Sequence, residues 1–372
     1  MDLLDEPGSA GDFLPEGISA EDRQAFLAYN QPWFRAHIPD PLPHFPLDPE
    51  PSLAVWEDYA SEAARRDWPA VLAERLPAFR FPVAEGMSRD SAYRQAVTKG
   101  EGSAEKGLHW ERADQLNMEV VYPPSGPIPV LSTPIRADFE TLLRVFLYRN
   151  EPQPIPPTMG AVMISGFVNR DRINRLREDF FTAHPEVRRS AWRKEWEMIQ
   201  ENRKALYQDR LILIGPGPYS GVPAAEIGLT EADWQVRSRT IRIHHECTHL
   251  FCKRVFGSMQ NNLFDELLAD FMGFRESFGS FSANLFLRCM GISPEGELGE
   301  TGRFFNYLKE PVLPYTVWKC QARLLAMAAR RLEEWSWAKK PEGHDPVGPL
   351  LLALARLSLP EIADAALPDS LT

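Results

Sequence analysis

The stretch that decides the fold of this chain is TIRIHHECTH, residues 240–249. It contains His-Glu-x-x-His and lies in a long run without proline. Thr230 and Asp233 have the spacing of a capping box at the start of a helix, and Gly257 fits its end. Residues four apart lie about 40° apart around a helix. We therefore expect one long helix that presents His245 and His249 on the same face.

This spacing suits a metal ion. Two imidazoles one helical turn apart can bind a single Zn²⁺, and Glu246 lies beside the position of a metal-bound water. After a turn at residues 258–262, a second helical pattern carries Asp-Glu-Leu-Leu-Ala-Asp at residues 265–270. Its Glu266 is a candidate third ligand. Asp270, one turn later, can hold the outer nitrogen of a ligand histidine.

These two helices resemble the gluzincin class of zinc metallopeptidases, which combine H-E-x-x-H with a glutamate, often followed by an aspartate four residues later, on a second helix. The match covers about residues 239–273. The resemblance implies a zincin-like core with Zn²⁺ as cofactor. It also implies specific roles for the matching residues: zinc ligands His245, His249 and Glu266, general base Glu246, and Asp270 as the support of a ligand histidine.

Two neutral imidazoles and one carboxylate leave zinc with a fourth position for water, as in catalytic sites. Zinc lowers the pKa of that water toward about 7, and Glu246 can accept its proton and pass it to the leaving group. We expect zinc-dependent hydrolysis of a peptide or small amide substrate. The alternatives are a non-peptidase metalloenzyme for a small metabolite or modified peptide, and a non-catalytic protein that keeps a zinc site.

Two other metal chemistries fit the sequence less well. The four cysteines have no C-x-x-C spacing, which predicts buried free thiols. Cys247 lies about 200° around the helix from His245 and is expected to face the core. Glu246 and His249 also form E-x-x-H, the half-motif of di-iron carboxylate bundles, but the chain has no second E-x-x-H.

Amide hydrolysis also needs a donor that stabilises the tetrahedral oxyanion. Tyr219, in a loop rich in glycine and proline, and Tyr315 are the catalytic candidates. Tyr307 and His344 are further possibilities for the same role. Arg242, on the histidine helix, is expected to pair with an acidic neighbour.

The chain as a whole predicts an α+β fold that is mostly helical. Most of its 33 prolines precede Gly160, and the long helical patterns follow it. We therefore expect a proline-rich N-terminal lobe at residues 1–157, a zincin-like metal-binding catalytic domain at 158–340, and a C-terminal helical tail at 341–372.

Short apolar runs at residues 118–122, 161–167 and 210–215 predict strands, and residues 123–134 are expected to be a connection. The strand at 210–215 is either an ordinary interior strand or an edge against which an extended peptide aligns. Residues 88–111 are polar and show little helical periodicity.

The net charge of −11 argues against binding to nucleic acid or to an anionic membrane. Residues 1–6 lack the basic and apolar regions of a signal peptide, and no apolar run is long enough to span a bilayer. A cytoplasmic enzyme is the simplest expectation.

Overall fold

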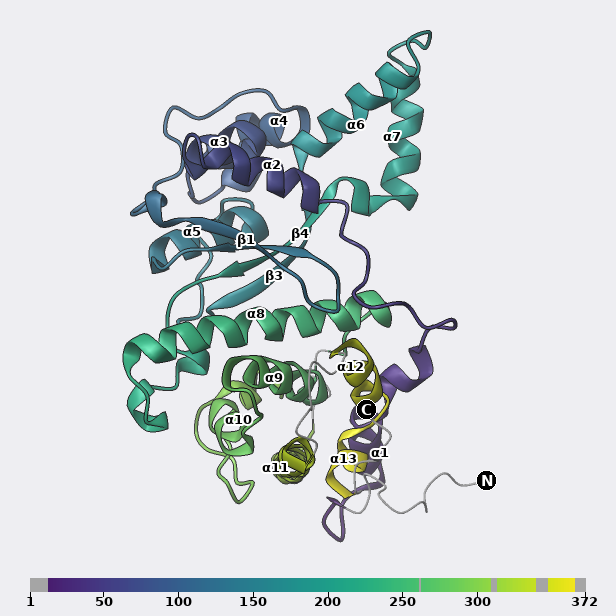
Figure 1. Ribbon diagram of the computed structural model, residues 1–372, viewed down its shortest axis with the longest axis vertical. Coiled ribbons are helices and arrows are strands. Elements are labelled where there is room, and N and C mark those ends of the chain that lie inside the picture. Colours follow the sequence, from purple (N-terminus) through teal and green to yellow (C-terminus); the bar gives the residue numbers. More distant parts are fainter. Residues whose placement is uncertain (1–12, 261, 309–312, 339–346, 365–372) are drawn as a thin grey trace. The chain divides into compact units, whose positions relative to one another are not determined.

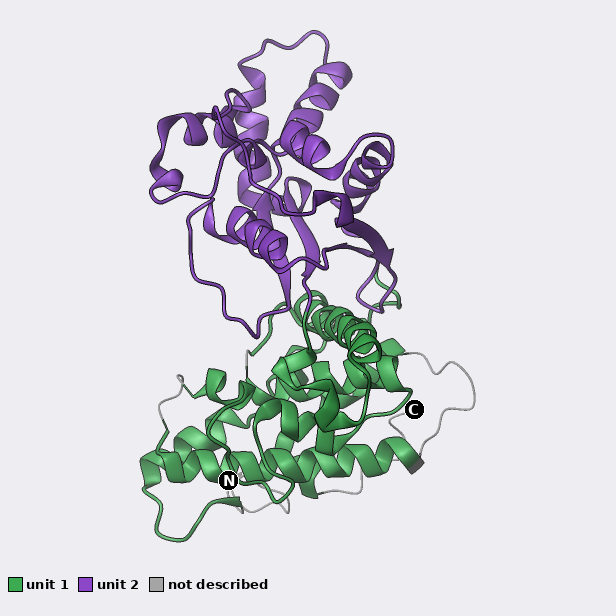
Figure 2. Cartoon of the chain, turned by 90° about the vertical axis from the view of Figure 1, so that its left-hand side faces the viewer, with its two compact units in different colours: residues 1–47, 217–372 green, residues 48–216 purple. Residues whose placement is uncertain are grey.

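The computed structural model describes residues 13–260, 262–308, 313–338 and 347–364. The fold is α+β and mostly helical, with one small sheet (Figure 1). The chain forms two compact units: unit 1 comprises residues 1–47 and 217–372, and unit 2 comprises residues 48–216 (Figure 2).

Unit 1 contains the α-helices α1 (Ala20–Tyr29), α8 (Glu231–Val255), α9 (Leu263–Phe278), α10 (Ala283–Met290), α11 (Tyr315–Ala338), α12 (Val347–Ala355) and α13 (Leu359–Asp364). It also contains the short 3-10 helices η2 (Trp33–His37), η7 (Tyr219–Gly221), η8 (Ala224–Ile227) and η9 (Arg303–Tyr307).

Unit 2 contains the α-helices α2 (Leu53–Ala63), α3 (Trp68–Arg75), α4 (Ser91–Lys99), α5 (Arg136–Tyr148), α6 (Arg170–Ala183) and α7 (Ala191–Asn202). Its strands are β1 (Asn117–Val121), β2 (Ile128–Ser132), β3 (Ala161–Val168) and β4 (Gln208–Ile214). Its 3-10 helices are η3 (Pro77–Arg80), η4 (Met87–Arg89), η5 (Ala113–Gln115) and η6 (Lys204–Leu206).

The four strands form one sheet in the order β1-β2-β4-β3. β1 pairs with β2 and β3 pairs with β4 in antiparallel fashion, whereas β2 and β4 are parallel. This pairing explains why unit 2 does not end at the expected limit of residue 157. Since β3 and β4 join the sheet begun by β1 and β2, residues 158–216 belong with the segment before them.

The structure corrects two expectations about strands. β4 lies between β2 and β3, so the run at 210–215 is an interior strand and offers no free edge to a peptide. The expected connection at 123–134 contains β2. The sequence did not predict this strand, because it contains Pro129 and proline is uncommon in strands. Pro129 pairs only with Val120 of β1, and the pairing of β2 with β4 begins at Val130. The missing N–H of Pro129 therefore removes no hydrogen bond between β2 and β4.

Unit 1 has a large apolar core around α8, α9 and α11, and the N-terminal segment contributes to it. Phe34 is fully buried, with its ring centroid 4.7 Å from that of Phe256. The buried amides of Asn30 and Gln321 donate to each other's oxygens at 2.8 and 3.1 Å. Residues 13–47 are therefore packed into unit 1, apart from the rest of the expected N-terminal lobe.

The backbones of α8 and α9 come close together at Gly273. A Cβ atom at this position would lie 2.8 Å from the carbonyl oxygen of Ile241 and 3.0 Å from its Cγ2. Only glycine lets the two backbones approach this far, and the approach brings the histidines of α8 close to the carboxylates of α9.

We predict that Gly273→Ala destabilises the protein by about 1–3 kcal/mol, because the added methyl group has no space. Helix propensity alone would stabilise the variant by about 1 kcal/mol, so the two effects differ in sign. Urea unfolding provides the measurement. Glu276→Ala, an exposed change on the same helix, is the control and should shift stability by less than about 0.5 kcal/mol. An unchanged or higher midpoint for Gly273→Ala would contradict the close packing.

Candidate metal centre

The predicted histidine helix is confirmed as α8. Thr230 is its N-cap and its hydroxyl accepts a hydrogen bond from the backbone N–H of Asp233 at 3.1 Å. The helix ends at Val255 with Phe256 as its C-cap, and Gly257 follows with a positive φ of 80°. The uninterrupted helix places His245 and His249 one turn apart, and their Nε2 atoms lie 3.0 Å from each other.

The second helix, α9, begins at an N-cap that the sequence analysis did not name. The side chain of Asn262 accepts hydrogen bonds from the N–H groups of Phe264 and Asp265 at 3.0 and 3.2 Å. Asparagine is a preferred N-cap residue because its side chain satisfies the free N–H groups of the first turn. The cap fixes the start of α9, and Glu266 and Asp270 follow one turn apart on this buried helix.

The three expected ligands come together. One ligand atom from each of His245, His249 and Glu266 lies within 4.8 Å of the others, and all three side chains are buried. A Glu266 carboxylate oxygen lies 3.7 Å from Nε2 of His245, and the other lies 3.4 Å from Nε2 of His249. This group could hold a metal ion.

The spacing of these atoms fits a tetrahedral ion. Metal–ligand bonds of 2.0–2.1 Å would separate two donor atoms by about 3.3 Å. The two Nε2 atoms are 3.0 Å apart, and each lies 3.4 or 3.7 Å from a different oxygen of Glu266, which is close to this value. Charge points the same way. Glu266 and Asp270 are both buried, and among the described side chains paired with them only Arg303 carries a charge once the histidines are neutral, as metal ligands must be. A divalent cation would offset the remaining negative charge.

Asp270 fixes the orientation of His245. Its Oδ1 lies 2.7 Å from Nδ1 of His245. A carboxylate can only accept, so Nδ1 carries the proton and the lone pair of Nε2 is directed to the other ligands. Burial would raise the pKa of Asp270, but Arg303 and His245 hold it below its usual range. The predicted role of Asp270 matches this geometry.

Tyr219 lies behind His245, on the side of Nδ1. Its hydroxyl donates to Asp270 and lies 3.0 Å from Nδ1 of His245. Burial and the Asp270 charge raise the pKa of this hydroxyl well above its usual value, which keeps it a donor. Because Nε2 faces the other ligands, Tyr219 is in place to position His245 and not to contact a reacting group as we expected.

The loop that carries Tyr219 is held by α8. Arg242 donates to the carbonyl oxygens of Gly217 and Pro218 at 2.7 and 3.0 Å, and the hydroxyl of Ser238 accepts from the N–H of Tyr219 at 2.9 Å. We expected Arg242 to pair with an acidic side chain. These contacts show it fixing the backbone of the loop, and its pairing with an acidic side chain stays a prediction.

Arg303 is a buried part of the centre that the sequence analysis missed. Its guanidinium donates to Asp270 and, at 2.6 Å, to the hydroxyl of Tyr219, and it lies 3.8 Å from a Glu266 oxygen. The only sequence signal is the preceding Gly302, which has φ 135°. A Cβ at Gly302 would lie 2.5 Å from the Met290 carbonyl oxygen, so this close approach to the end of α10 sets the start of η9.

The remaining oxyanion candidates differ in their surroundings. Tyr307 interacts with Glu266 through its hydroxyl, and burial together with the Glu266 charge raises its pKa. Tyr315 opens α11, is 55% exposed and has Lys319 over its ring. None of its contacts within the described ranges reaches the metal ligands, so the structure does not bring Tyr315 into the site. His344 lies outside the described residues.

Glu246 and His249 complete the centre. Glu246 is half-buried and close enough for its charge to act on His249. Burial would lower the pKa of His249, but its hydrogen bond to Glu266 and the surrounding carboxylates raise it. Burial would raise the pKa of Glu266, but His245, His249 and Arg303 together hold it well below its usual range.

None of the cysteines belongs to the group of candidate metal ligands. Cys247, Cys252 and Cys289 are buried free thiols, as expected, while Cys320 is half-buried. Burial raises the pKa of Cys289 to about 12, so it remains a thiol at neutral pH. In the described part of the chain, no helix is both long and apolar enough to cross a membrane.

The fold and the site define an α+β protein with a buried candidate metal centre. The chain belongs to a family of unknown function, DUF7005, whose model matches residues 16–366. Comparisons with curated proteins and with solved structures found no match.

We predict that the purified protein binds one Zn²⁺ per chain, and that His249→Ala and Glu266→Ala each reduce bound zinc to less than about a tenth, because two ligands hold zinc weakly. Elemental analysis after gel filtration measures the ratio. His244→Ala removes the neighbouring histidine, which has no part in the ligand group, and should keep the full equivalent. Equal zinc content in the ligand variants and the wild type would refute the site.

We predict that Asp270→Asn lowers zinc affinity about 10- to 100-fold, the usual cost of losing the group that orients a ligand histidine. Competition with a chromogenic chelator measures the affinity. Tyr219→Phe should have a smaller effect, because Asp270 still accepts from His245. The assigned role of Asp270 fails if the folded variant binds zinc as tightly as the wild type.

Proposed function

We propose that this protein is a zinc-dependent hydrolase, and specifically a gluzincin-like metallopeptidase that cleaves a peptide or other amide bond. One observation carries the proposal: ligand atoms of His245, His249 and Glu266 converge, and Glu246 lies on the same helix as the two histidines. A site that only stabilises the fold has no need of a carboxylate next to its ligands.

His245, His249 and Glu266 would hold the metal. Zinc in such a site supplies Lewis-acid polarisation of the scissile carbonyl and lowers the pKa of a water. The described residues offer three ligand side chains within reach of one another and no fourth, whereas structural zinc sites are closed by four protein ligands, usually with cysteines. The three-ligand set therefore favours a catalytic role.

Glu246 would act as the general base. It can take a proton from the attacking water and transfer it to the leaving amine, which would otherwise depart as an unstable anion. Its half-buried position fits a group that must be near the ligands and still meet a substrate.

Tyr307 is the described tyrosine best placed to stabilise an oxyanion. Its hydroxyl lies beside Glu266, and its raised pKa keeps it protonated. It replaces Tyr315 in this proposed role. Tyr219 and Arg303 would act through Asp270, by keeping His245 in the tautomer and orientation that a ligand needs.

A second candidate is a metalloenzyme that acts on a small metabolite or a modified peptide. The interior position of β4 favours it, because the strand expected to align an extended peptide has both neighbours in place. The two candidates share the metal chemistry and differ in substrate size. A screen of metal-loaded protein against a peptide library and a panel of small acyl amides, read by mass spectrometry, separates them.

We predict that Glu246→Gln keeps bound zinc but lowers turnover of whatever substrate that screen identifies by at least about 100-fold, the scale of general-base catalysis. Glu276→Gln, the same change at an exposed position of α9, should leave turnover unchanged. Near-normal turnover in Glu246→Gln would exclude Glu246 as the base. Loss of zinc in that variant would show instead that Glu246 supports the metal.

A further inference from the structure

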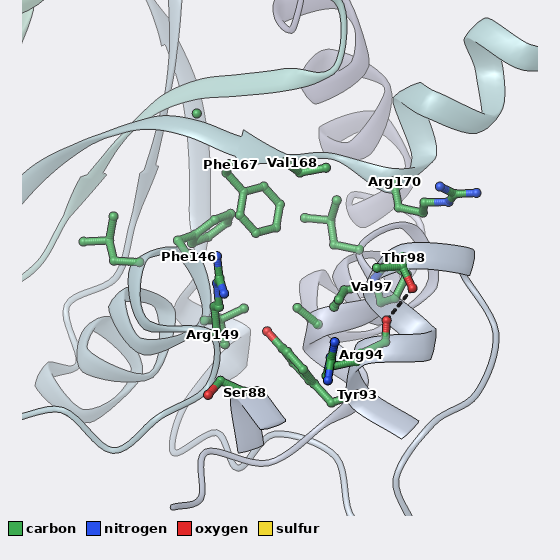
Figure 3. Close-up of a pocket in the computed structure, with 16 residues that line it drawn as sticks. Ser88, Tyr93, Arg94, Val97, Thr98, Phe146, Arg149, Phe167, Val168 and Arg170 are labelled. Carbon is green, nitrogen blue, oxygen red and sulfur yellow. Dashed lines mark hydrogen bonds between the residues drawn. The ribbon is translucent and has the colours of Figure 1, made fainter. Parts of the chain in front are cut away.

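A second candidate site lies in unit 2, in a cavity of about 450 Å³ (Figure 3). Its walls come from α4, the end of α5, the end of β3 and the start of α6. Its apolar lining includes Val97, Phe146, Phe167 and Val168. All lining residues belong to unit 2, so the site can be considered apart from the metal centre.

A β-bulge builds the aromatic wall of this cavity. The register between β3 and β4 shifts between Ser165 and Phe167, and Gly166 takes φ 92°. The extra residue places Phe167 opposite Asp209, on the same face as Ile164, which pairs with Leu211. Phe167 packs edge-on against Phe146 with ring centroids 4.8 Å apart.

An unusual backbone conformation places Arg149 at the same cavity. Arg149 and Asn150 both have positive φ, 52° and 61°. The buried side chain of Asn150 holds them there by donating to the carbonyl oxygens of Ala78 and Phe81 at 3.0 and 2.9 Å. Such conformations in residues other than glycine persist where the surroundings enforce them, and they occur often at binding sites.

Arg149 has no carboxylate partner among the described residues. The nearest acidic side chain in sequence, Glu151, is already engaged, because it accepts from the N–H groups of Gly86 and Ser88 at 2.9 and 2.7 Å. Arg94 and Arg170 also line the cavity, and neither forms an ion pair with a described residue. The lining contains no aspartate or glutamate, so no lining carboxylate neutralises the guanidinium of Arg149.

Tyr93 adds a hydroxyl group that faces the cavity. The residue is only 4% exposed, and its hydroxyl has no hydrogen-bond partner within the described ranges. Figure 3 shows this hydroxyl directed into the ring of lining side chains, toward the side of Arg149. Burial raises the pKa of Tyr93 to about 12, against the effect of Arg149. A protonated hydroxyl beside a guanidinium offers two kinds of donor to one anion.

We propose that this cavity binds a small aromatic carboxylate that carries no amino group. The carboxylate would accept from the Arg149 guanidinium and the Tyr93 hydroxyl, and the ring would lie against Phe146 and Phe167. An ammonium group would be repelled by the arginines and would find no acidic partner, so free amino acids are excluded.

Calorimetric titration of the full chain with 3-phenylpropionate tests the proposal. A chelator present throughout keeps the carboxylate from binding to zinc, and His249→Ala should give the same result as wild type. We predict a Kd below about 1 mM, at least about tenfold tighter than for 3-phenylpropanamide, L-phenylalanine or inorganic phosphate. These probes respectively remove the charge, add an ammonium group and remove the ring.

Two variants locate the binding. Arg149→Gln should weaken binding of 3-phenylpropionate at least about tenfold, and Tyr93→Phe about three- to tenfold. Arg65→Gln, at an exposed arginine outside the lining, makes the same charge change and should have no effect. Circular dichroism checks that each variant is folded. No binding of the acid, equal binding of the amide, tighter binding of phosphate, or full affinity in Arg149→Gln would each overturn the proposal.

Discussion

The candidate metal centre depends on one buried carboxylate, Asp270, which is fully shielded from solvent. It accepts hydrogen bonds from His245 on α8, Tyr219 on η7 and Arg303 on η9. A buried carboxylate without partners would cost several kcal/mol, so these donors are needed for the charge to be tolerated. Because Asp270 needs these donors, segments far apart in the sequence come together at this one residue of α9. In meeting it, the chain also gives His245 the tautomer that a metal ligand requires.

Two glycines allow the backbone to come close enough for these contacts. Gly273 lets α8 and α9 approach at Ile241, and Gly302 lets the chain before η9 rest on the end of α10. In both places a Cβ atom would lie within 3 Å of a carbonyl oxygen. The contact at Gly273 brings the ligand residues together, and the contact at Gly302 places Arg303 in the centre. The relative positions of the side chains in the centre therefore depend on close packing of the backbone as much as on the ligand side chains themselves.

The two units use arginine in opposite ways. In unit 1, Arg303 is buried and donates to Asp270 and Tyr219, so its charge supports the protein's own side chains. In unit 2, Arg149 is held in an uncommon conformation at a cavity without acidic lining residues, so its charge remains for a ligand. The protein thus combines a candidate site for hydrolysis with a candidate site for an anion, and each has its own physical test.

The sequence by itself determined the parts of the protein whose signals are local. The spacing of His245 and His249, the cap at Thr230 and the stop at Gly257 follow helical periodicity and hydrogen bonding within a few residues, and the structure has them as expected. The same holds for Glu266 and Asp270, one turn apart on the next helix. The α+β class followed from long helical patterns beside short apolar runs.

Only the tertiary structure decided what depends on contacts between distant residues. Arg303 lies in a sequence with no motif, and its importance appears only when the close approach at Gly302 brings it to Asp270. Tyr219 and Tyr315 were equivalent in the sequence, but one is buried behind His245 and the other is exposed. The sheet order made β4 an interior strand and joined residues 158–216 to unit 2. Strand pairing and backbone approach depend on the whole fold, and no local pattern records them.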